Sequence, residues 1–278
     1  TGSVNIAIGN ALTSNTTGES NISIGSNSLG DNTTGNYNVA LGRQALGDNT
    51  TADSNTAIGY NSLFYNTTGQ SNTALGKDAL KANTTADYNV AIGALCLDAN
   101  TTGANNTAAG VAALAENTDG TENVAVGANA LDAATTADAN TAIGYNALTA
   151  NGTGGYNVAL GHSALLANAT GVNNVAIGYQ TLNNNASPTA NVAIGYRACK
   201  NNNSNYGVFI GDRAASNGIV GGEKNVSVGH YSLFSLTTGA YNVAIGANTL
   251  DDNTTASHNT AVGYAALASN VTGANNTA

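Results

Sequence analysis

The chain has 278 residues, of which 34 are glycine, and only 8% are charged. Hydrophobic residues make up 42% of the sequence but aromatic residues only 5%, with no tryptophan and no methionine, so a core must be built from Ala, Val, Ile and Leu. The formal net charge of −9 argues against nucleic acid as a partner, because phosphate binding needs clustered Lys and Arg, and no apolar run approaches the ~18 residues of a membrane-spanning helix.

A motif of the form Asn-[Val/Ile/Thr]-Ala-[Ile/Leu/Val]-Gly recurs along the whole chain. Residues 55–59, NTAIG, return as residues 72–76, NTALG, a shift of 17 positions. The motif glycines lie at positions 9, 25, 42, 59, 76, 93, 110, 127, 144, 161, 178, 195, 211, 229, 246 and 263. Most of the intervals between them are 17 residues, and the exceptions are two of 16 and one of 18. A fixed short period is typical of a solenoid, so we expect residues 1–278 to form one continuous repeat array without a domain boundary.

Each repeat is expected to contain a short strand, a second short strand and a turn. In residues 38–42 the side chains alternate, so that Val39 and Leu41 share one face and Ala40 takes the other. A leucine follows four residues after the glycine, as at Leu46, and Asn-Thr-Thr-Gly or Asn-Thr-Thr-Ala then forms the turn. The Gly, Asn and Thr content and the short segments disfavour helices. The predicted fold class is all-β: a parallel β-solenoid, or β-roll, of about 16 coils with a 17-residue repeat.

The two faces of the first strand predict which residues form the core. We expect the larger aliphatic residues to point into the coil, namely Ile58, Leu75, Ile92, Ile143 and Leu160 in the strands, with Leu63, Leu80, Leu148 and Leu165 after them. The opposite face carries the small residues Ala40, Ala57, Ala74, Ala91, Ala125, Ala142 and Ala159. A row kept this small indicates that another backbone approaches closely, which would be a neighbouring chain. The alternative is a lone solenoid whose alanine row faces inward.

Stacked coils would place each repeat position in a ladder of like residues. The strand asparagine is present in every unit except the one where Gly207 replaces it. The turn asparagine is replaced by Ala134 and by Leu236, and is lost in the irregular copy around Gly218. Because stacked side-chain amides can bond one another, each coil is expected to act as the template for the next.

The unit N-[VIT]-A-[ILV]-G-x-x-[AS]-L, followed by N-T-T-G, resembles the head repeats of trimeric autotransporter adhesins. It resembles still more the repeat arrays of bacteriophage tail fibres and related surface fibres, and the resemblance covers essentially the whole chain. It implies a left-handed parallel β-roll, three chains lying side by side as a homotrimer, and an extracellular location on a virion tail fibre or a bacterial cell surface.

The repeat is irregular over residues 196–224. The spacing slips twice, the leucine becomes Cys199 and then Ala215, and Phe209 replaces the small strand residue. Two interpretations remain open. One is a structural joint or bulged coil, and the other is a receptor-contacting patch displayed on a regular scaffold.

The candidate receptor contacts in this stretch are mainly basic. Four of the seven basic residues of the chain lie here, against two acidic residues, which leaves a local balance of +2 in a chain of −9. The candidate residues are Arg197, Lys200, Tyr206, Arg213 and Lys224. A second candidate surface is a row of tyrosines directly after the glycine, which is either plain strand surface or a set of aromatic faces that stack on sugars: Tyr60, Tyr145, Tyr179, Tyr196 and Tyr264.

The residues that usually carry catalysis or bind metals are scattered. His162, His230 and His258 have no Cys or carboxylate at metal-ligand spacing, and no G-x-S-x-G motif occurs. The aspartates gather in predicted turns, where Asp is favoured for local bonding, although a glycosidase pair could be hidden among them. Cys96 and Cys199 are expected to be small buried hydrophobes without a disulfide. We therefore expect no enzyme activity, no metal and no cofactor.

The leading functional hypothesis is a structural and adhesive fibre segment that extends and presents a receptor-binding tip for attachment to a host or surface. Its expected partners are itself, flanking fibre domains and cell-surface carbohydrate, with no nucleic acid and no membrane insertion. Both ends of the sequence cut through the repeat, so we expect an internal fragment of a longer fibre. The alternatives are a bacterial trimeric adhesin head, an ice-binding solenoid suggested by the repeated Thr-Thr pairs, and a polysaccharide-degrading tailspike.

Overall fold

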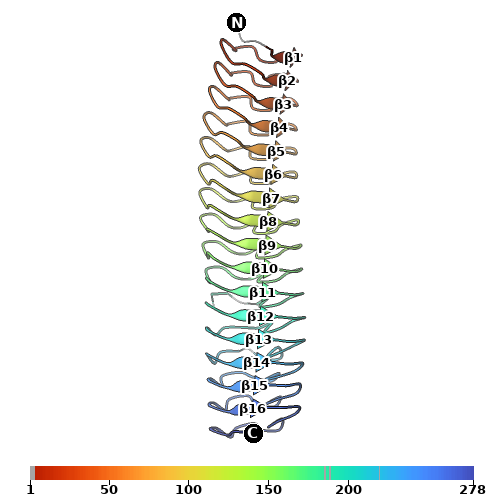
Figure 1. The fold of residues 1–278 in the computed structure, drawn as a ribbon, viewed down its shortest axis with the longest axis vertical. Helices are drawn as coiled ribbons and strands as arrows, with labels where there is room; N and C mark the ends of the chain where they lie inside the picture. The colour runs from red at the N-terminus through yellow and green to blue at the C-terminus, as the bar shows by residue number, and fades with distance from the viewer. Residues whose placement is uncertain (1–3, 185, 188, 219) are drawn as a thin grey trace. The chain divides into compact units, whose positions relative to one another are not determined.

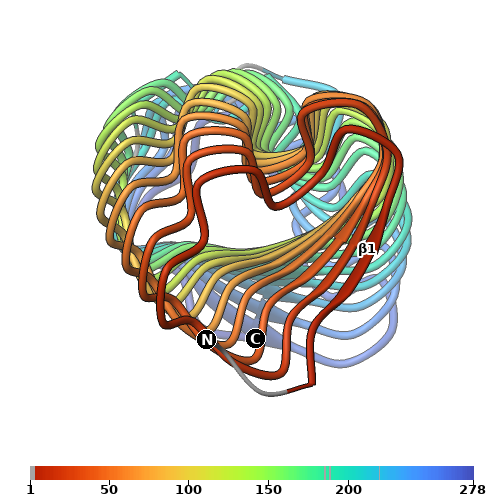
Figure 2. The same cartoon turned by 90° about the horizontal axis from the view of Figure 1, so that it is seen from above.

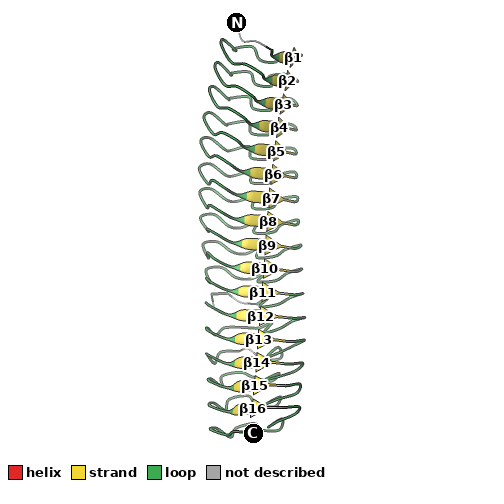
Figure 3. Ribbon diagram, in the orientation of Figure 1, coloured by secondary structure: helices red, strands yellow, loops and turns green. Residues whose placement is uncertain are grey.

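The structure, a computed structural model, describes residues 4–184, 186–187, 189–218 and 220–278. In this part of the chain every strand is three residues long and parallel to its neighbours, and there is no helix (Figures 1 and 3). The predicted all-β parallel β-solenoid with a repeat of about 17 residues is therefore confirmed. The strands are β1 (Ile6–Ile8), β2 (Ile22–Ile24), β3 (Val39–Leu41), β4 (Thr56–Ile58), β5 (Thr73–Leu75), β6 (Val90–Ile92), β7 (Thr107–Ala109), β8 (Val124–Val126), β9 (Thr141–Ile143), β10 (Val158–Leu160), β11 (Val175–Ile177), β12 (Val192–Ile194), β13 (Val208–Ile210), β14 (Val226–Val228), β15 (Val243–Ile245) and β16 (Thr260–Val262).

The contacts of the chain fall into two compact units, Thr1–Ala139 with β1–β8 and Asn140–Ala278 with β9–β16. Within each unit the strands pair in chain order and in register, as Ala40 pairs with Ala57 and Ala176 with Ala193. In Figure 2 the red and orange coils of the first unit follow one another with the same outline. The coils of 16 and 18 residues keep this register, since Val208 pairs with Val192 on one side and Val226 on the other. The changes in length are therefore absorbed in the turns.

No second short strand forms around the leucine in the described residues, so this part of the prediction was wrong. Leu46 and Leu63 have φ angles of 51° and 49°, which is the left-handed region and is incompatible with a strand. The residue two before each of these leucines is also left-handed, as at Gln44 with φ of 62°. The coils are still hydrogen-bonded here, because Leu46 N donates to the carbonyl oxygen of Ser62 in the next coil at 3.0 Å. The segment is a tight turn that bonds between coils as a strand would.

The motif glycine is required by its backbone. Gly42 has a φ of 134°, and a Cβ built on it would lie 2.6 Å from the carbonyl oxygen of Gly59 in the next coil. Any side chain would therefore clash with backbone as well as strain the φ angle. The repeat keeps glycine at this position because the next coil leaves no room for a side chain and the φ angle is positive.

The core lies inside the coils, and the structure corrects which strand residues form it. Leu63, Leu80, Leu148 and Leu165 are fully buried, as predicted. The prediction for the strand residues was wrong: Leu75, Ile92, Ile143 and Leu160 are 43%, 44%, 38% and 43% exposed, and Ile58 is only half-buried. The alanines that were expected to meet a neighbouring chain are instead inside the coil, all at 0% exposure: Ala40, Ala57, Ala74, Ala91, Ala125, Ala142 and Ala159. The alternative of an inward alanine row is thus confirmed, because the turn leucine already fills the narrow interior.

Phe209 shows how little room the coil contains. It takes the inward alanine position in β13 and is fully buried, and the leucine position is reduced to Cys199 and Ala215 in the adjacent turns. The asparagine position two residues earlier is Gly207, where a Cβ would lie 2.3 Å from the Phe209 ring. One large side chain is thus accommodated by smaller residues around it, which keeps the interior filled.

Two asparagine ladders run through each unit. Asn38 Oδ1 accepts the backbone N–H of Asn55 at 2.9 Å, and Asn49 Nδ2 donates to Asn32 Oδ1 at 2.9 Å. At the predicted gaps the ladders change: Gly207 still donates its N–H to Asn191 Oδ1 at 2.8 Å, whereas Ala134 leaves Asn117 Oδ1 buried without a hydrogen-bond partner. Val220 and Leu236, both fully buried, occupy the turn position as apolar residues. The predicted template role of the amides is confirmed in these contacts.

Candidate functional site

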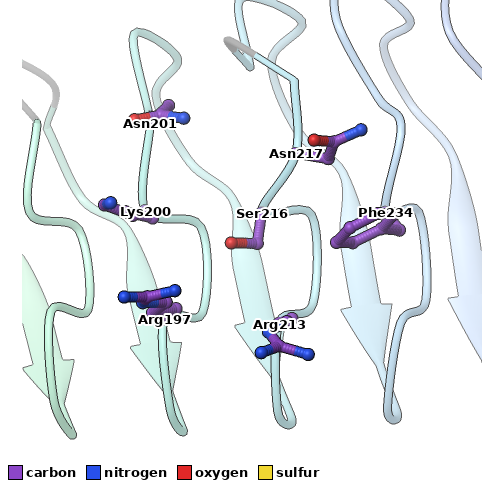
Figure 4. A pocket seen from close by; sticks show the side chains of 7 residues that line it. All are labelled: Arg197, Lys200, Asn201, Arg213, Ser216, Asn217 and Phe234. Atoms are coloured by element: carbon purple, nitrogen blue, oxygen red, sulfur yellow. The ribbon is translucent and has the colours of Figure 1, made fainter.

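The five predicted contact residues separate into two groups. Arg197 and Arg213 are each the second residue after a motif glycine, and Lys200 is the fifth, so all three lie in the turns that follow β12 and β13 (Figure 4). Tyr206 and Lys224 lie one coil apart in the turn before the next strand, in a different row. Only Arg197, Lys200 and Arg213 are brought together.

These three cations line an open pocket of about 220 Å³. Its walls come from three successive coils, the turns after β12, β13 and β14, as Figure 4 shows. Lys200, Ser216 and Phe234 each stand five residues after a motif glycine, so they are neighbours along the stack. Because Ser216 is small and lies between two large side chains, a hollow remains. Asn201 and Asn217 complete the lining.

The two guanidinium groups are held in place by aromatic rings and polar groups. Arg197 Cζ lies 5.0 Å from the centre of the Tyr196 ring, and Arg197 Nε donates to Gln180 Oε1 at 3.1 Å. Arg213 lies 5.6 Å from the same Tyr196 ring and donates to the Tyr231 hydroxyl. That hydrogen bond raises the pKa of Arg213. Cations over aromatic faces are attracted by the ring quadrupole, so Tyr196 orients both arginines.

None of the three pocket cations forms an ion pair in the described part of the chain, although Asp212, the residue before Arg213, adds to the Tyr231 hydrogen bond in raising the pKa of Arg213. Within the described part of the chain, no carboxylate oxygen lies within 4.0 Å of a nitrogen of Arg197, Lys200 or Arg213. The nearby Asp212 lies 3.7 Å from His230 Nε2, and Glu223 Oε1 accepts from Asn205 Nδ2 at 3.1 Å. Three positive charges therefore meet in a pocket that no carboxylate lines.

The other two predicted contacts are placed differently. Lys224 Nζ lies 5.2 Å from the centre of the Tyr241 ring and 3.4 Å from its hydroxyl, and the Tyr241 ring stacks on His258 at 5.1 Å. Tyr206 is 56% exposed. These residues form a surface row on the coils and do not reach the pocket lining.

The tyrosine row after the glycine is a stack of rings in the second unit. The rings of Tyr145, His162, Tyr179 and Tyr196 follow one another at centre-to-centre distances of 5.2, 5.3 and 5.4 Å. Tyr179 and Tyr196 are nearly parallel, at 10°, so each covers a face of the other. Tyr60, whose ring lies 5.7 Å from Arg43 Cζ, and Tyr264, which is 80% exposed, are outside this stack, so stacking on sugars stays a hypothesis for the row.

The scattered acidic residues and histidines form no recognisable centre. No group of three or more His, Cys, Asp or Glu side chains that could hold a metal occurs among the residues described. Several aspartates cap backbone groups, as predicted for turns: Asp53 Oδ1 accepts the N–H of Asn36 at 2.6 Å, and Asp87 Oδ1 that of Gln70 at 2.6 Å. Burial raises the pKa of Asp98, whose Oδ1 is buried without a hydrogen-bond partner.

Modification and redox sites are buried. Apart from the half-buried Asn15, the asparagines of the N-T-T triplets are buried, as at Asn32, Asn49 and Asn66, which are bonded within the ladder, so these side chains are not accessible for glycosylation. Cys96 and Cys199 are both free and buried, as predicted. Burial raises the pKa of Cys96 to about 12, which leaves it almost entirely as the unreactive thiol at neutral pH.

A second feature, missed from the sequence, is the outward face of the strands. The first and third residues of each strand point away from the core, and the third is Ile, Leu or Val in every strand except β7, where it is Ala109. No strand contains a charged residue. The sequence does contain the signal for this face. Side chains alternate along each strand, so if the central alanine points inward, the first and third residues must point outward.

Comparison with known proteins gives no assignment: no protein-family model matches the chain, and no curated protein matches it. In the described ranges, no helix has the length and apolar character needed to cross a bilayer.

Proposed function

We propose that this chain is a segment of a homotrimeric extracellular fibre, which extends and presents a receptor-binding part of the fibre for attachment. The observation that carries the proposal is the outward strand face: its third residue is apolar in every coil, its first is Val, Ile or Thr, and the strands of the described residues carry no charge. Leu75, Ile92 and Leu160 are each more than two-fifths exposed on it. Exposed aliphatic rows of this kind are typical of surfaces that a partner covers.

The size of the face is compatible with an interface. Eight strands about 4.8 Å apart, with three residues of about 3.3 Å each, give each unit roughly 400 Å² of strand surface. This lies within the roughly 300–600 Å² of the largest apolar patch on a typical monomer, which is often functional. The surface repeats once per coil, so a partner that matches it along its whole length needs the same repeat, as a further copy of this chain has. Because the alanine row is buried inside the coil, the outward aliphatic row is the face that we assign to this interface.

The fibre role follows from what the repeats build. Each coil adds length through the two asparagine ladders and carries little other chemistry. The resemblance to tail-fibre and adhesin-head repeats supports three chains and a location on a virion or a bacterial surface, with flanking fibre domains as further partners. Between these, the tail fibre is the closer resemblance, and the adhesin head is the alternative.

The ice-binding alternative has less support. In most Thr-Thr pairs the first hydroxyl is used inside the stack, as Thr33 Oγ1 donates to the carbonyl oxygen of Thr50 at 3.0 Å and Thr67 Oγ1 to that of Thr84 at 3.0 Å. The pairs also lie in turns and not on the strand face. A regular double row of free threonine hydroxyls is therefore missing from this surface.

The interface is tested by paired substitutions. Leu160→Glu places a charge on the outward face, where Leu160 is 43% exposed, and should leave the fold intact but give a single-chain mass in sedimentation. Tyr156→Glu, at a 65% exposed position just before the same strand, is the control and should keep the assembled mass. An assembled Leu160→Glu chain would place the interface elsewhere.

A further inference from the structure

We propose that the pocket between the turns after β12, β13 and β14 binds an acidic sugar, one that carries a carboxylate or a sulfate ester, as part of a surface polysaccharide. This inference rests on the proposed attachment function and names the class of ligand that the attachment would use. The pocket lies in the second unit and is formed by Arg197, Lys200, Asn201, Arg213, Ser216, Asn217 and Phe234.

The charge of the pocket selects an anion. Arg197, Lys200 and Arg213 all line it in a chain whose net charge is −9, and no carboxylate forms an ion pair with them among the described residues. Unpaired cations gathered in one place repel one another and gain most from an anionic ligand. The arrangement is therefore suited to a carboxylate or sulfate group.

The two arginines are oriented by neighbouring side chains and still have N–H groups available to bind a ligand. Arg197 donates through Nε to Gln180, and Arg213 through one terminal nitrogen to Tyr231. Each guanidinium keeps further N–H groups for a ligand, and planar guanidinium groups bind carboxylates with two parallel hydrogen bonds. The Tyr196 ring between the arginines fixes their positions, which lowers the cost of ordering them on binding.

The rest of the lining suits a sugar ring. Asn201 Oδ1 accepts from Asn184 Nδ2 at 2.7 Å, which leaves the Asn201 amide N–H groups as donors, and Ser216 and Asn217 add a hydroxyl and an amide. Such groups match the hydroxyls of a carbohydrate. Phe234 provides an apolar wall, which suits the C–H face of a pyranose. The volume of about 220 Å³ is below the roughly 300–1,000 Å³ of pockets for drug-sized ligands, so it fits one ring of a longer polymer.

The test is binding of the full chain to defined polymers by isothermal titration calorimetry. The probes are polygalacturonate for carboxylates, dextran sulfate for sulfate esters, unmodified dextran as the neutral polymer, and duplex DNA as a phosphate polymer. We expect binding to at least one of the acidic polysaccharides and none to dextran. Arg197→Gln, Lys200→Gln and Arg213→Gln should each weaken it about tenfold or more, since a hydrogen bond to a charged group is lost.

The matched control is Lys224→Gln, which removes a basic side chain of the same irregular stretch outside the pocket and should bind as the unmodified chain does. Ser216→Phe, which fills the hollow without changing charge, should abolish binding. The proposal is overturned by absent binding to both acidic polysaccharides, by equal binding to dextran, by tighter binding to DNA, or by equal losses in Lys224→Gln and the pocket variants. The mass of the same samples reports on assembly separately. Trimers that do not bind acidic polysaccharides would refute only this inference, whereas single chains that do bind them would refute only the proposed assembly.

Discussion

Asn38 and Asn49, which are eleven residues apart, donate their side-chain amides to the same acceptor, the carbonyl oxygen of Ala52, at 2.8 and 3.2 Å. The same convergence recurs where Asn72 and Asn83 meet at the carbonyl oxygen of Ala86, at 2.8 and 3.1 Å. Each coil is thus closed on itself by the amides that also link it to the coil before. This double use explains why both asparagines are needed in each repeat.

The gap in the turn ladder gives a first prediction. Ala134 occupies an asparagine position, and Asn117 Oδ1 is left buried without a hydrogen-bond partner. Ala134→Asn should supply the missing donor and raise the free energy of unfolding by about 1 kcal/mol. The opposite change, Asn66→Ala, removes the donor to Asn49 Oδ1 and Gly69 O and should cost about 2 kcal/mol or more. Urea denaturation measures both, and an Ala134→Asn chain less stable than the unmodified one would contradict the ladder argument.

The packing around Phe209 gives a second prediction. Phe209→Ala should leave a cavity and cost about 3–5 kcal/mol. Gly207→Asn alone should also destabilise the chain, because its side chain would meet the Phe209 ring. The double variant should be more stable than the sum of the two losses predicts, since the asparagine then enters the space that the ring vacates. A double-mutant cycle by denaturation checks this, and strict additivity would show that the two positions do not share the space.

The buried carboxylates give a third prediction, on pH. Burial, reinforced by Asp252, raises the pKa of Asp251, and burial likewise raises the pKa of Asp48, Asp98 and Asp132. The folded chain then keeps these protons to higher pH than the unfolded chain, so their contribution to stability is present below the unfolded pKa and is lost as pH rises through the folded pKa. We expect the free energy of unfolding to fall between about pH 4 and neutrality.

The matched pair for this prediction is Asp251→Asn and Asp252→Asn. Asp251 Oδ1 is buried without a hydrogen-bond partner, whereas Asp252 is exposed. Asp251→Asn should stabilise the chain at neutral pH and flatten its pH dependence, and Asp252→Asn should do so much less. Denaturation curves at a series of pH values measure the slope, and equal slopes for the two variants would exclude burial of Asp251 as the cause.

The solenoid can be predicted from the sequence because each 17-residue repeat corresponds to one coil. The motif glycine, the turn leucine and the two asparagines each recur at fixed positions, and each has the same structural role wherever it recurs. The alternation of side chains along a strand does not show which of the two faces points into the coil. Ala57 and Ile58 lie on opposite faces, and the larger residue was expected to be buried. The turn leucines, with their left-handed φ angles, narrow the coil so that a small residue fits beneath the strand, and Phe209 is accommodated only where the leucine is replaced by Cys199 and Ala215.

The candidate site was predicted in part. The excess of basic residues in residues 196–224 identified Arg197, Lys200 and Arg213, because charge is visible in composition. The sequence alone did not separate them from Tyr206 and Lys224, which lie in another row. Ser216 and Phe234 were missed, since each is unremarkable in its own repeat and becomes part of a pocket only when three coils are stacked. Their shared offset of five residues from a motif glycine was the available signal.

Sedimentation equilibrium of the unmodified chain at micromolar concentration tests whether the outward strand face joins copies of this chain. We expect a mass of three times the 27.4 kDa of one chain, unchanged on moderate dilution. A mass near 27.4 kDa would contradict assembly through this face, and a mass near twice that value would contradict the trimer.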